Sequence, residues 1–190
     1  MWRRVRNGMT KKEFKQLAES YIYLDGATGS NLVRAGMPSG VCPEQWILEH
    51  PHVMLDLQRQ YVAAGTDILY IPTFTANRIK LKDYGLEDRL EEMIEGLTAI
   101  SRQAASEAER PVYIAGDLTM TGEQLAPVGE LDLEELIDVY KEQIVALCRA
   151  GADLLVVETM MSLAEARAAL IAAKETCSLP VMVTMTFEEG

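Results

Sequence analysis

Short apolar runs alternate with longer segments of helical periodicity along this chain. The apolar runs are rich in β-branched residues and predict five strands, at residues 21–24, 67–72, 112–116, 153–157 and 180–187. Apolar residues at three- and four-residue steps, together with helix-start signals, predict helices at residues 11–19, 51–64, 87–109, 133–150 and 163–176. A regular alternation of strands and helices is typical of an α/β fold.

One pattern occurs twice ahead of a predicted strand. Ala-Gly-Thr-Asp at residues 64–67 and Ala-Gly-Ala-Asp at residues 150–153 each lead into a run of apolar residues. In both, the glycine suits the left-handed position that ends a helix. Strands that are apolar throughout are buried on both faces, as in parallel sheets covered by helices. The repeat therefore predicts a parallel sheet.

An open sheet of the flavodoxin or Rossmann type has five or six strands and could account for this strand count. The interval of about 45 residues between the first two predicted strands leaves room for an elaborate loop and favours a barrel. An eight-stranded barrel takes roughly 250 residues. We therefore expect part of a TIM-type (β/α)₈ barrel with about five parallel strands. Residues 11–190 would be its N-terminal part, truncated after the fifth strand, and residues 1–10 a disordered or artificially added leader.

Composition narrows the classes of function. The formal net charge of −11 disfavours nucleic acid and anionic membrane surfaces as partners, and no apolar stretch is long enough for a membrane span. The cysteines at positions 42, 148 and 177 lie far apart. We therefore expect neither a disulfide framework nor a metal site built from this chain alone. These features predict a cytoplasmic protein.

Polar residues follow the predicted strands. Carboxyl and hydroxyl groups stand at or just after the strand ends, in Asp25, Thr73, Thr75, Asp117 and Glu158. In α/β architectures the carboxyl ends of the strands form the ligand-binding edge. Carboxylates there would suit a ligand ammonium group, and backbone N–H groups of the turn at residues 26–29 would suit a ligand carboxylate. An amino acid fits this description.

Each of these residues also has a purely structural interpretation. The turn at residues 26–29 could be only a tight connection, Asp25 could cap a helix, and Glu158 could form a structural salt bridge. Thr73 and Thr75 could satisfy loop backbone groups. The turn is not a Gly-x-Gly-x-x-Gly motif and has no phosphate-binding lysine, which argues against a nucleotide site.

Three motifs together resemble homocysteine S-methyltransferase domains over about residues 20–190. They are Asp-Gly-Ala-Thr-Gly-Ser-Asn-Leu at residues 25–32, Thr-Phe-Thr-Ala-Asn-Arg-Ile-Lys-Leu at residues 73–81 with Tyr-Gly-Leu at 84–86, and Glu158-Thr159 with Glu165. The second motif is most similar to the N-terminal homocysteine-binding module of cobalamin-dependent methionine synthases. Two features depart from the family pattern: Pro72 stands where many relatives have Asn, and Asp117-Leu118-Thr119 replaces a loop of small residues.

The resemblance implies a methyltransferase that transfers a methyl group to the zinc-activated thiolate of homocysteine and gives methionine. It implies that the substrate ammonium group is held by Asp25 and Glu158, and that its carboxylate is met by Gly26, Ala27, Thr73 and Thr75. It also implies zinc bound by three cysteines, which we expect beyond Gly190, and a partner module that binds cobalamin or folate. We therefore assign no catalytic residue and no metal ligand within this chain, and we expect the fragment alone to be inactive.

Other functions remain open from the sequence. The chain could be a half-barrel that binds an amino acid or a methylated substrate in a multi-subunit methyl-transfer system, without activity of its own. Its open sheet edges could pair with another copy into a homo-oligomer. A lyase-type barrel could use Glu158 or Asp117 as a base, although no lysine directly follows a predicted strand. A nucleotide-binding open sheet is the remaining alternative.

Overall fold

The structure is a computed structural model, and it describes residues 8–187. Residues 1–7 of the predicted leader lie outside this range. Met9 is buried, and its backbone N–H donates to the carbonyl of Asp153 at 2.9 Å. Thr10 caps the first helix, where its hydroxyl accepts the N–H of Glu13. The nature and the boundary of the leader stay predictions.

The described residues form a four-stranded parallel sheet in the order β1-β2-β3-β4. Its strands are β1 (Ile68–Ile71), β2 (Tyr113–Leu118), β3 (Leu154–Met160) and β4 (Val181–Met185). Each strand pairs with the next one along the chain, so the strand order never reverses. A doubly wound open sheet has such a reversal, whereas successive neighbours are the arrangement of a barrel. The predicted α/β class and parallel sheet are confirmed.

The first predicted strand, at residues 21–24, is not a strand. It contributes a single parallel bridge between Leu24 and Ile68. The backbone N–H of Tyr23 bonds to the side chain of Asp67 at 2.9 Å, and not to a strand carbonyl. Tyr21 and Tyr23 are 88% and 63% exposed, so little packing supports an extended ladder here. The segment runs beside β1 and pairs with it through this single bridge.

The five predicted helices are confirmed, and three short ones occur where no helix was expected. The predicted helices are α1 (Lys11–Leu17), α4 (Pro51–Ala64), α6 (Leu90–Ser106, after the 3₁₀ turn η1, Glu87–Arg89), α7 (Leu133–Ala150) and α8 (Leu163–Thr176). The additional ones are α2 (Gly29–Arg34), α3 (Pro43–Glu49) and α5 (Arg78–Lys82). Gly65 and Gly151 end α4 and α7 with φ of 109° and 101°, as the repeated pattern predicted.

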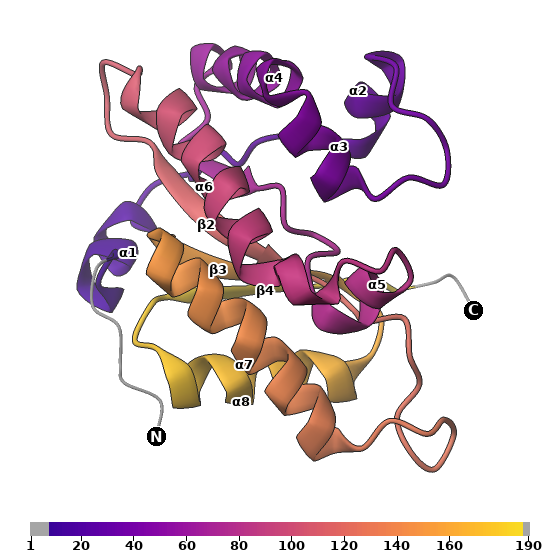
Figure 1. The fold of residues 1–190 in the computed structure, drawn as a ribbon. Coiled ribbons are helices and arrows are strands. Elements are labelled where there is room, and N and C mark those ends of the chain that lie inside the picture. The colour runs from indigo at the N-terminus through magenta and orange to yellow at the C-terminus, as the bar shows by residue number, and fades with distance from the viewer. Residues whose placement is uncertain (1–7, 188–190) are drawn as a thin grey trace.

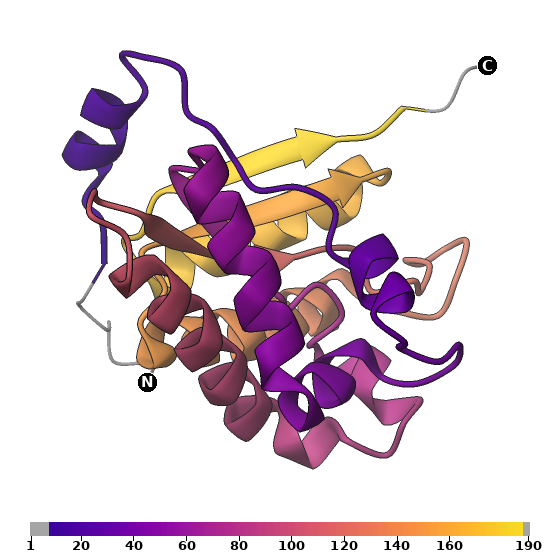
Figure 2. The same ribbon diagram turned by 90° about the horizontal axis from the view of Figure 1, so that it is seen from above.

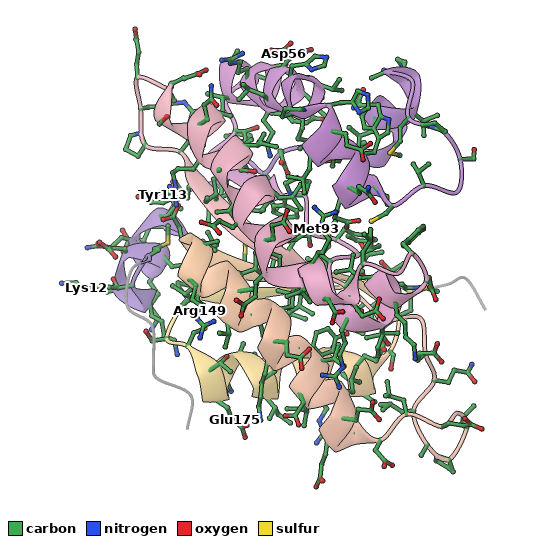
Figure 3. The ribbon with its side chains drawn as sticks, in the orientation of Figure 1. Lys12, Asp56, Met93, Tyr113, Arg149 and Glu175 are labelled. Carbon is green, nitrogen blue, oxygen red and sulfur yellow. The ribbon has the colours of Figure 1, made fainter. Side chains whose placement is uncertain are left out.

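Helices α4, α6, α7 and α8 lie together along one side of the sheet (Figures 1 and 2). The face beneath them, called here the helix-covered face, carries the fully buried side chains of Leu69, Ile71, Ile114, Leu118, Leu155 and Val157. In Figure 3, Met93 of α6 lies in the interior, whereas Asp56 and Glu175 lie at the periphery. This layer is the main hydrophobic core.

The other side of the sheet, called here the opposite face, holds a smaller cluster. Its buried members are Ile68, Ala115, Leu154 and Val156, covered by the partly exposed side chains of Phe14, Leu17 and Ile22. Helix α1 is thus the cover of this cluster, near the amino ends of the strands. In the part of the chain that the structure describes, no helix combines the length and apolar character needed to cross a bilayer.

Candidate functional site

A cavity of about 440 Å³ opens at the carboxyl ends of the strands. Five of the six residues predicted to bind substrate line it: Asp25, Gly26, Ala27, Thr75 and Glu158. Asp25 and Glu158, the two carboxyls predicted to hold a ligand ammonium group, therefore face one common space. They are 133 residues apart in the sequence. Four acidic residues and no basic residue line the cavity, so its electrostatic character favours a cationic group.

Asp25 is fixed against the end of β1. Its backbone N–H donates to the carbonyl of Ile68 at 3.2 Å, and its Oδ2 accepts the N–H of Tyr70 at 2.9 Å. Burial raises the pKa of Asp25 to about 7, and the negative charge of Glu158 adds to the rise. A nearby positive charge would stabilise the ionised form of this buried carboxyl.

Glu158 projects from an irregular end of β3. The register between β3 and β4 shifts between Val157 and Met160, which marks a bulge. Within it Thr159 has a φ of 56°, a left-handed conformation that β-branched residues rarely adopt. The backbone is held there by Thr119, whose hydroxyl donates to the carbonyl of Glu158 at 2.9 Å. Burial raises the pKa of Glu158. Such local strain recurs where a side chain is aimed into a functional site.

The turn after Asp25 is anchored through one carbonyl. The carbonyl of Ala27 accepts the hydroxyl of Tyr61 at 2.8 Å and the amide of Asn31 at 2.6 Å. A Cβ on Gly26 would stand 3.0 Å from the ring of Tyr61, which is tighter than ordinary contact. A glycine therefore lets the turn lie close against α4 at this point.

The two threonines of the predicted site have different surroundings. Thr73 is fully buried behind the cavity, and its hydroxyl donates to the carbonyl of Asp117 at 2.9 Å. Thr75 lines the cavity, but its N–H and hydroxyl both donate to Oε1 of Glu44, at 2.8 and 2.7 Å. The contacts expected between these threonines and a substrate carboxylate stay predictions.

Two acidic residues of the cavity, Glu44 and Asp117, were not among the predicted substrate-binding residues. Glu44 is 2% exposed and lies on α3, a short helix that the apolar pattern did not reveal; only Pro43 at its first turn could have indicated it. Asp117 stood out as a polar residue at a strand end. Burial, followed by the charge of Glu158, raises the pKa of Asp117 well above its usual range.

The residues present do not fit a zinc ion. Among residues 8–187, no group of three or more His, Cys, Asp or Glu side chains could hold a metal. The three cysteines are buried in two separate places: Cys42 contacts Glu44 at 3.4 Å, and Cys148 contacts Cys177. No chemical step is therefore assigned to a metal here.

Comparison with known proteins decides the family. The family model of the homocysteine S-methyltransferases matches residues 22–190. The chain belongs to the homocysteine S-methyltransferase family. The resemblance carried by its three motifs is confirmed. The matched range begins three residues before Asp25, the first residue that lines the cavity.

Relatives within the family include methionine synthases that are much longer than this chain. The methionine synthase of Mycobacterium leprae (strain TN) is 28% identical over 186 residues, which cover 90% of this chain and 15% of that protein. The methionine synthase of Mycobacterium tuberculosis (strain ATCC 25618 / H37Rv) is also 28% identical over 186 residues, covering 90% and 16%. The chain thus spans about one sixth of these relatives.

Solved structures of the family share the fold. The homocysteine methyltransferase MmuM from Escherichia coli in its metallated form has a TM-score of 0.67 and 23% identity, covering 83% of this chain and 62% of that one. Its oxidised form has a TM-score of 0.71 and 21% identity, covering 92% and 65%. The partial barrel expected from the sequence agrees with this likeness.

Proposed function

We propose that this chain binds homocysteine as the substrate-binding part of a homocysteine S-methyltransferase. In the reaction homocysteine loses its thiol proton and its sulfur forms a bond to the methyl group of a donor. The bond between that methyl group and the donor breaks, its electron pair stays on the donor, and methionine forms. The main support for the proposal is that Asp25, Glu158 and the turn at residues 26–29 line the same cavity. Family membership supports the same substrate.

The cavity suits each part of homocysteine. The ammonium group would lie against the carboxyls of Asp25 and Glu158, where charge-assisted hydrogen bonds are strong. The carboxylate would lie toward the backbone of Gly26 and Ala27. The methylene carbons would contact the apolar part of the lining, which includes Leu32, Ile47 and Phe74.

Thiol activation and methyl donation are assigned to groups outside the described residues. The proposal keeps zinc as the activating ion and a cobalamin- or folate-binding module as the donor, in line with the much longer methionine synthases among the relatives. Because residues 8–187 hold no metal-binding group, the proposal for this chain concerns binding and orientation of the amino acid.

Isothermal titration calorimetry with L-homocysteine tests the proposal. The wild-type chain is expected to bind it, and Asp25→Asn and Glu158→Gln are each expected to weaken binding about tenfold or more, the range for a lost hydrogen bond to a charged group. Glu134→Gln, on an exposed position of α7, is the matched control and should bind as the wild type does. 4-Mercaptobutanoate, which lacks the amino group, should bind far more weakly than homocysteine.

Two results would contradict this function. One is the absence of binding by the wild-type chain at millimolar L-homocysteine. The other is unchanged affinity in both Asp25→Asn and Glu158→Gln while their thermal unfolding remains cooperative.

A second candidate is an amino-acid-binding module without activity of its own. The observation in its favour is the missing metal-binding group among residues 8–187. Such a module would bind L-methionine about as tightly as L-homocysteine, and added zinc would leave both affinities unchanged. A marked preference of the wild-type chain for L-homocysteine over L-methionine would instead support the methyltransferase.

A further inference from the structure

Asp117 is held by its backbone so that its carboxyl reaches the cavity. Its N–H and its carbonyl both bond to the hydroxyl of Thr73, at 3.3 and 2.9 Å, and the carbonyl also accepts the amide of Gln143 at 3.3 Å. Asp117 follows Ala115 by two positions on β2, so both side chains project from the opposite face. Its carboxyl lines the cavity although the residue is only 4% exposed.

The carboxyl of Asp117 has an acidic neighbour, and one of its oxygens accepts no hydrogen bond. The carboxyl is hydrogen-bonded to the carboxyl of Glu158, and two such groups in contact must share a proton. Oδ1 of Asp117 is buried, and no donor among the described residues bonds to it. In the acid form, Asp117 donates its O–H to Glu158, and its carboxyl keeps lone pairs that can accept a further hydrogen bond. A buried acceptor without a partner is costly, and a bound ligand can relieve that cost.

A ligand is the natural donor for this oxygen. No Lys, Arg or His lines the cavity, so no charged side chain in the lining supplies an N–H. The carboxyls do not form a metal-binding group, which disfavours a divalent cation as the partner. A primary ammonium group has three N–H donors, and Asp25, Glu158 and Asp117 offer three carboxyl acceptors around the same space.

We propose that Asp117 is a third ligand-binding carboxyl, which accepts a hydrogen bond from the ammonium group of the bound amino acid and so selects a primary amine over an N-methylated one. This inference rests on the proposed function, since it places the ammonium group between Asp25 and Glu158. An N-methylated amine has one N–H fewer, so one of the three acceptors would stay buried without a donor. The methyl group would also have to occupy the space beside a polar atom.

Calorimetry with L-homocysteine and N-methyl-L-homocysteine tests the inference. The wild-type chain is expected to prefer the primary amine about tenfold or more. Asp117→Asn should keep this preference, because an amide can donate to Glu158 through Nδ2 and accept from the ligand through Oδ1. Asp117→Ala should lose about tenfold in affinity for L-homocysteine and much less for the N-methyl compound, so the preference shrinks.

Controls separate recognition from folding. Asp132→Ala changes an exposed aspartate whose side chain makes no capping hydrogen bond, and it should bind both compounds as the wild type does. Thermal unfolding of each variant reports its stability, and Asp117→Ser serves as a second small variant if the alanine variant does not fold. The preference between the two amines is the decisive quantity, because a purely structural role of Asp117 would not change it.

The outcomes distinguish this inference from the function on which it rests. Unchanged affinity and unchanged preference in Asp117→Ala and Asp117→Ser, with weakened binding in Asp25→Asn, would overturn the role of Asp117 and leave homocysteine binding standing. A wild-type chain that binds both amines equally would also overturn it. Absence of any L-homocysteine binding by the wild-type chain would overturn both proposals together.

Discussion

The helix-covered face and the opposite face are built from alternate residues of the same strands, yet they carry different chemistry. Along β3, Leu155 and Val157 are buried under helices, while Leu154 and Val156 join the smaller cluster and Glu158 continues their face into the cavity. The first face is apolar along its whole length. The second is apolar near the amino ends of the strands and acidic at the carboxyl ends. One face thus stabilises the fold, and the other combines a small apolar cluster with the acidic cavity that we propose binds the ligand.

The largest expected effect tests the unequal packing of the two faces. Leu154 and Leu155 are adjacent, chemically identical and fully buried, but they lie on different faces. Leu155→Ala is expected to lower the free energy of unfolding toward the upper part of the range of about 2–5 kcal/mol. Leu154→Ala should fall in the lower part, because the partly exposed residues that cover its cluster can move into the space.

Urea unfolding of the two variants measures this difference, and each serves as the other's control. An equal cost for both substitutions, or a larger cost for Leu154→Ala, would mean that the cover provided by α1 packs as firmly as the four-helix layer.

The second prediction concerns the acidic end of the opposite face. Because the folded protein raises the pKa of Asp25 from 3.8 to about 7, the folded state binds more protons than the unfolded state between these values. The stability that this group contributes is full below about pH 4 and is lost as the pH rises toward 7. The raised pKa values of Asp117 and Glu158 act in the same direction. One pKa unit corresponds to about 1.4 kcal/mol.

Thermal unfolding at several pH values between 4 and 8 checks the sign. The melting temperature of Asp25→Asn, relative to the wild type, should rise as the pH increases. Val128→Ala, which changes an exposed side chain without a titratable group, should show a constant difference from the wild type. A constant difference for Asp25→Asn as well would show that its carboxyl titrates alike in the folded and unfolded chains.

A third and smaller effect separates stability from binding at a single position. Asp117→Leu removes a buried acid beside Glu158 and fills its place with an apolar group. Burial and the like charge of Glu158 both make the Asp117 carboxylate costly in the fold. We therefore expect the free energy of unfolding to stay unchanged or to rise by about 1 kcal/mol, while L-homocysteine binding is lost. A fall in stability of more than about 2 kcal/mol would assign Asp117 to the structural part of the face.

The comparison of the faces also shows what the sequence could predict. The apolar runs and glycine signals identified four strands, because burial on both faces leaves an uninterrupted apolar run, and the helical periodicity identified five helices. The convergence of Asp25 and Glu158 followed from one rule, that the carboxyl ends of parallel strands meet at one edge. That rule holds whatever the local packing.

Features that depend on local packing could not be predicted. An uninterrupted apolar run does not reveal which residues face the helices, so the burial of Thr73 behind the cavity had no signal. Residues 21–24 look like a strand, but within residues 8–187 they pair with β1 through a single bridge. Glu44 lies on a seven-residue helix, too short for a clear periodic pattern. Each of these outcomes is decided by neighbours distant in the sequence.

The smallest expected effect tests how the end of β3 is held in place. Thr159 adopts a φ of 56° immediately after Glu158, a conformation that costs a residue with a Cβ roughly 1–2 kcal/mol. Glycine would remove this strain but would lose more backbone entropy on folding. Thr159→Gly is therefore expected to raise the free energy of unfolding by about 0.5 kcal/mol and to weaken L-homocysteine binding slightly, because Glu158 becomes less firmly oriented.

Urea unfolding and calorimetry on the same variant check both parts of this expectation. Thr159→Ala is the matched control, since alanine removes the hydroxyl and the methyl group but keeps the Cβ that causes the strain. It should not gain stability. A loss of stability in Thr159→Gly that Thr159→Ala does not share would show that the left-handed residue is under no strain. The bulge would then orient Glu158 without a cost to the fold.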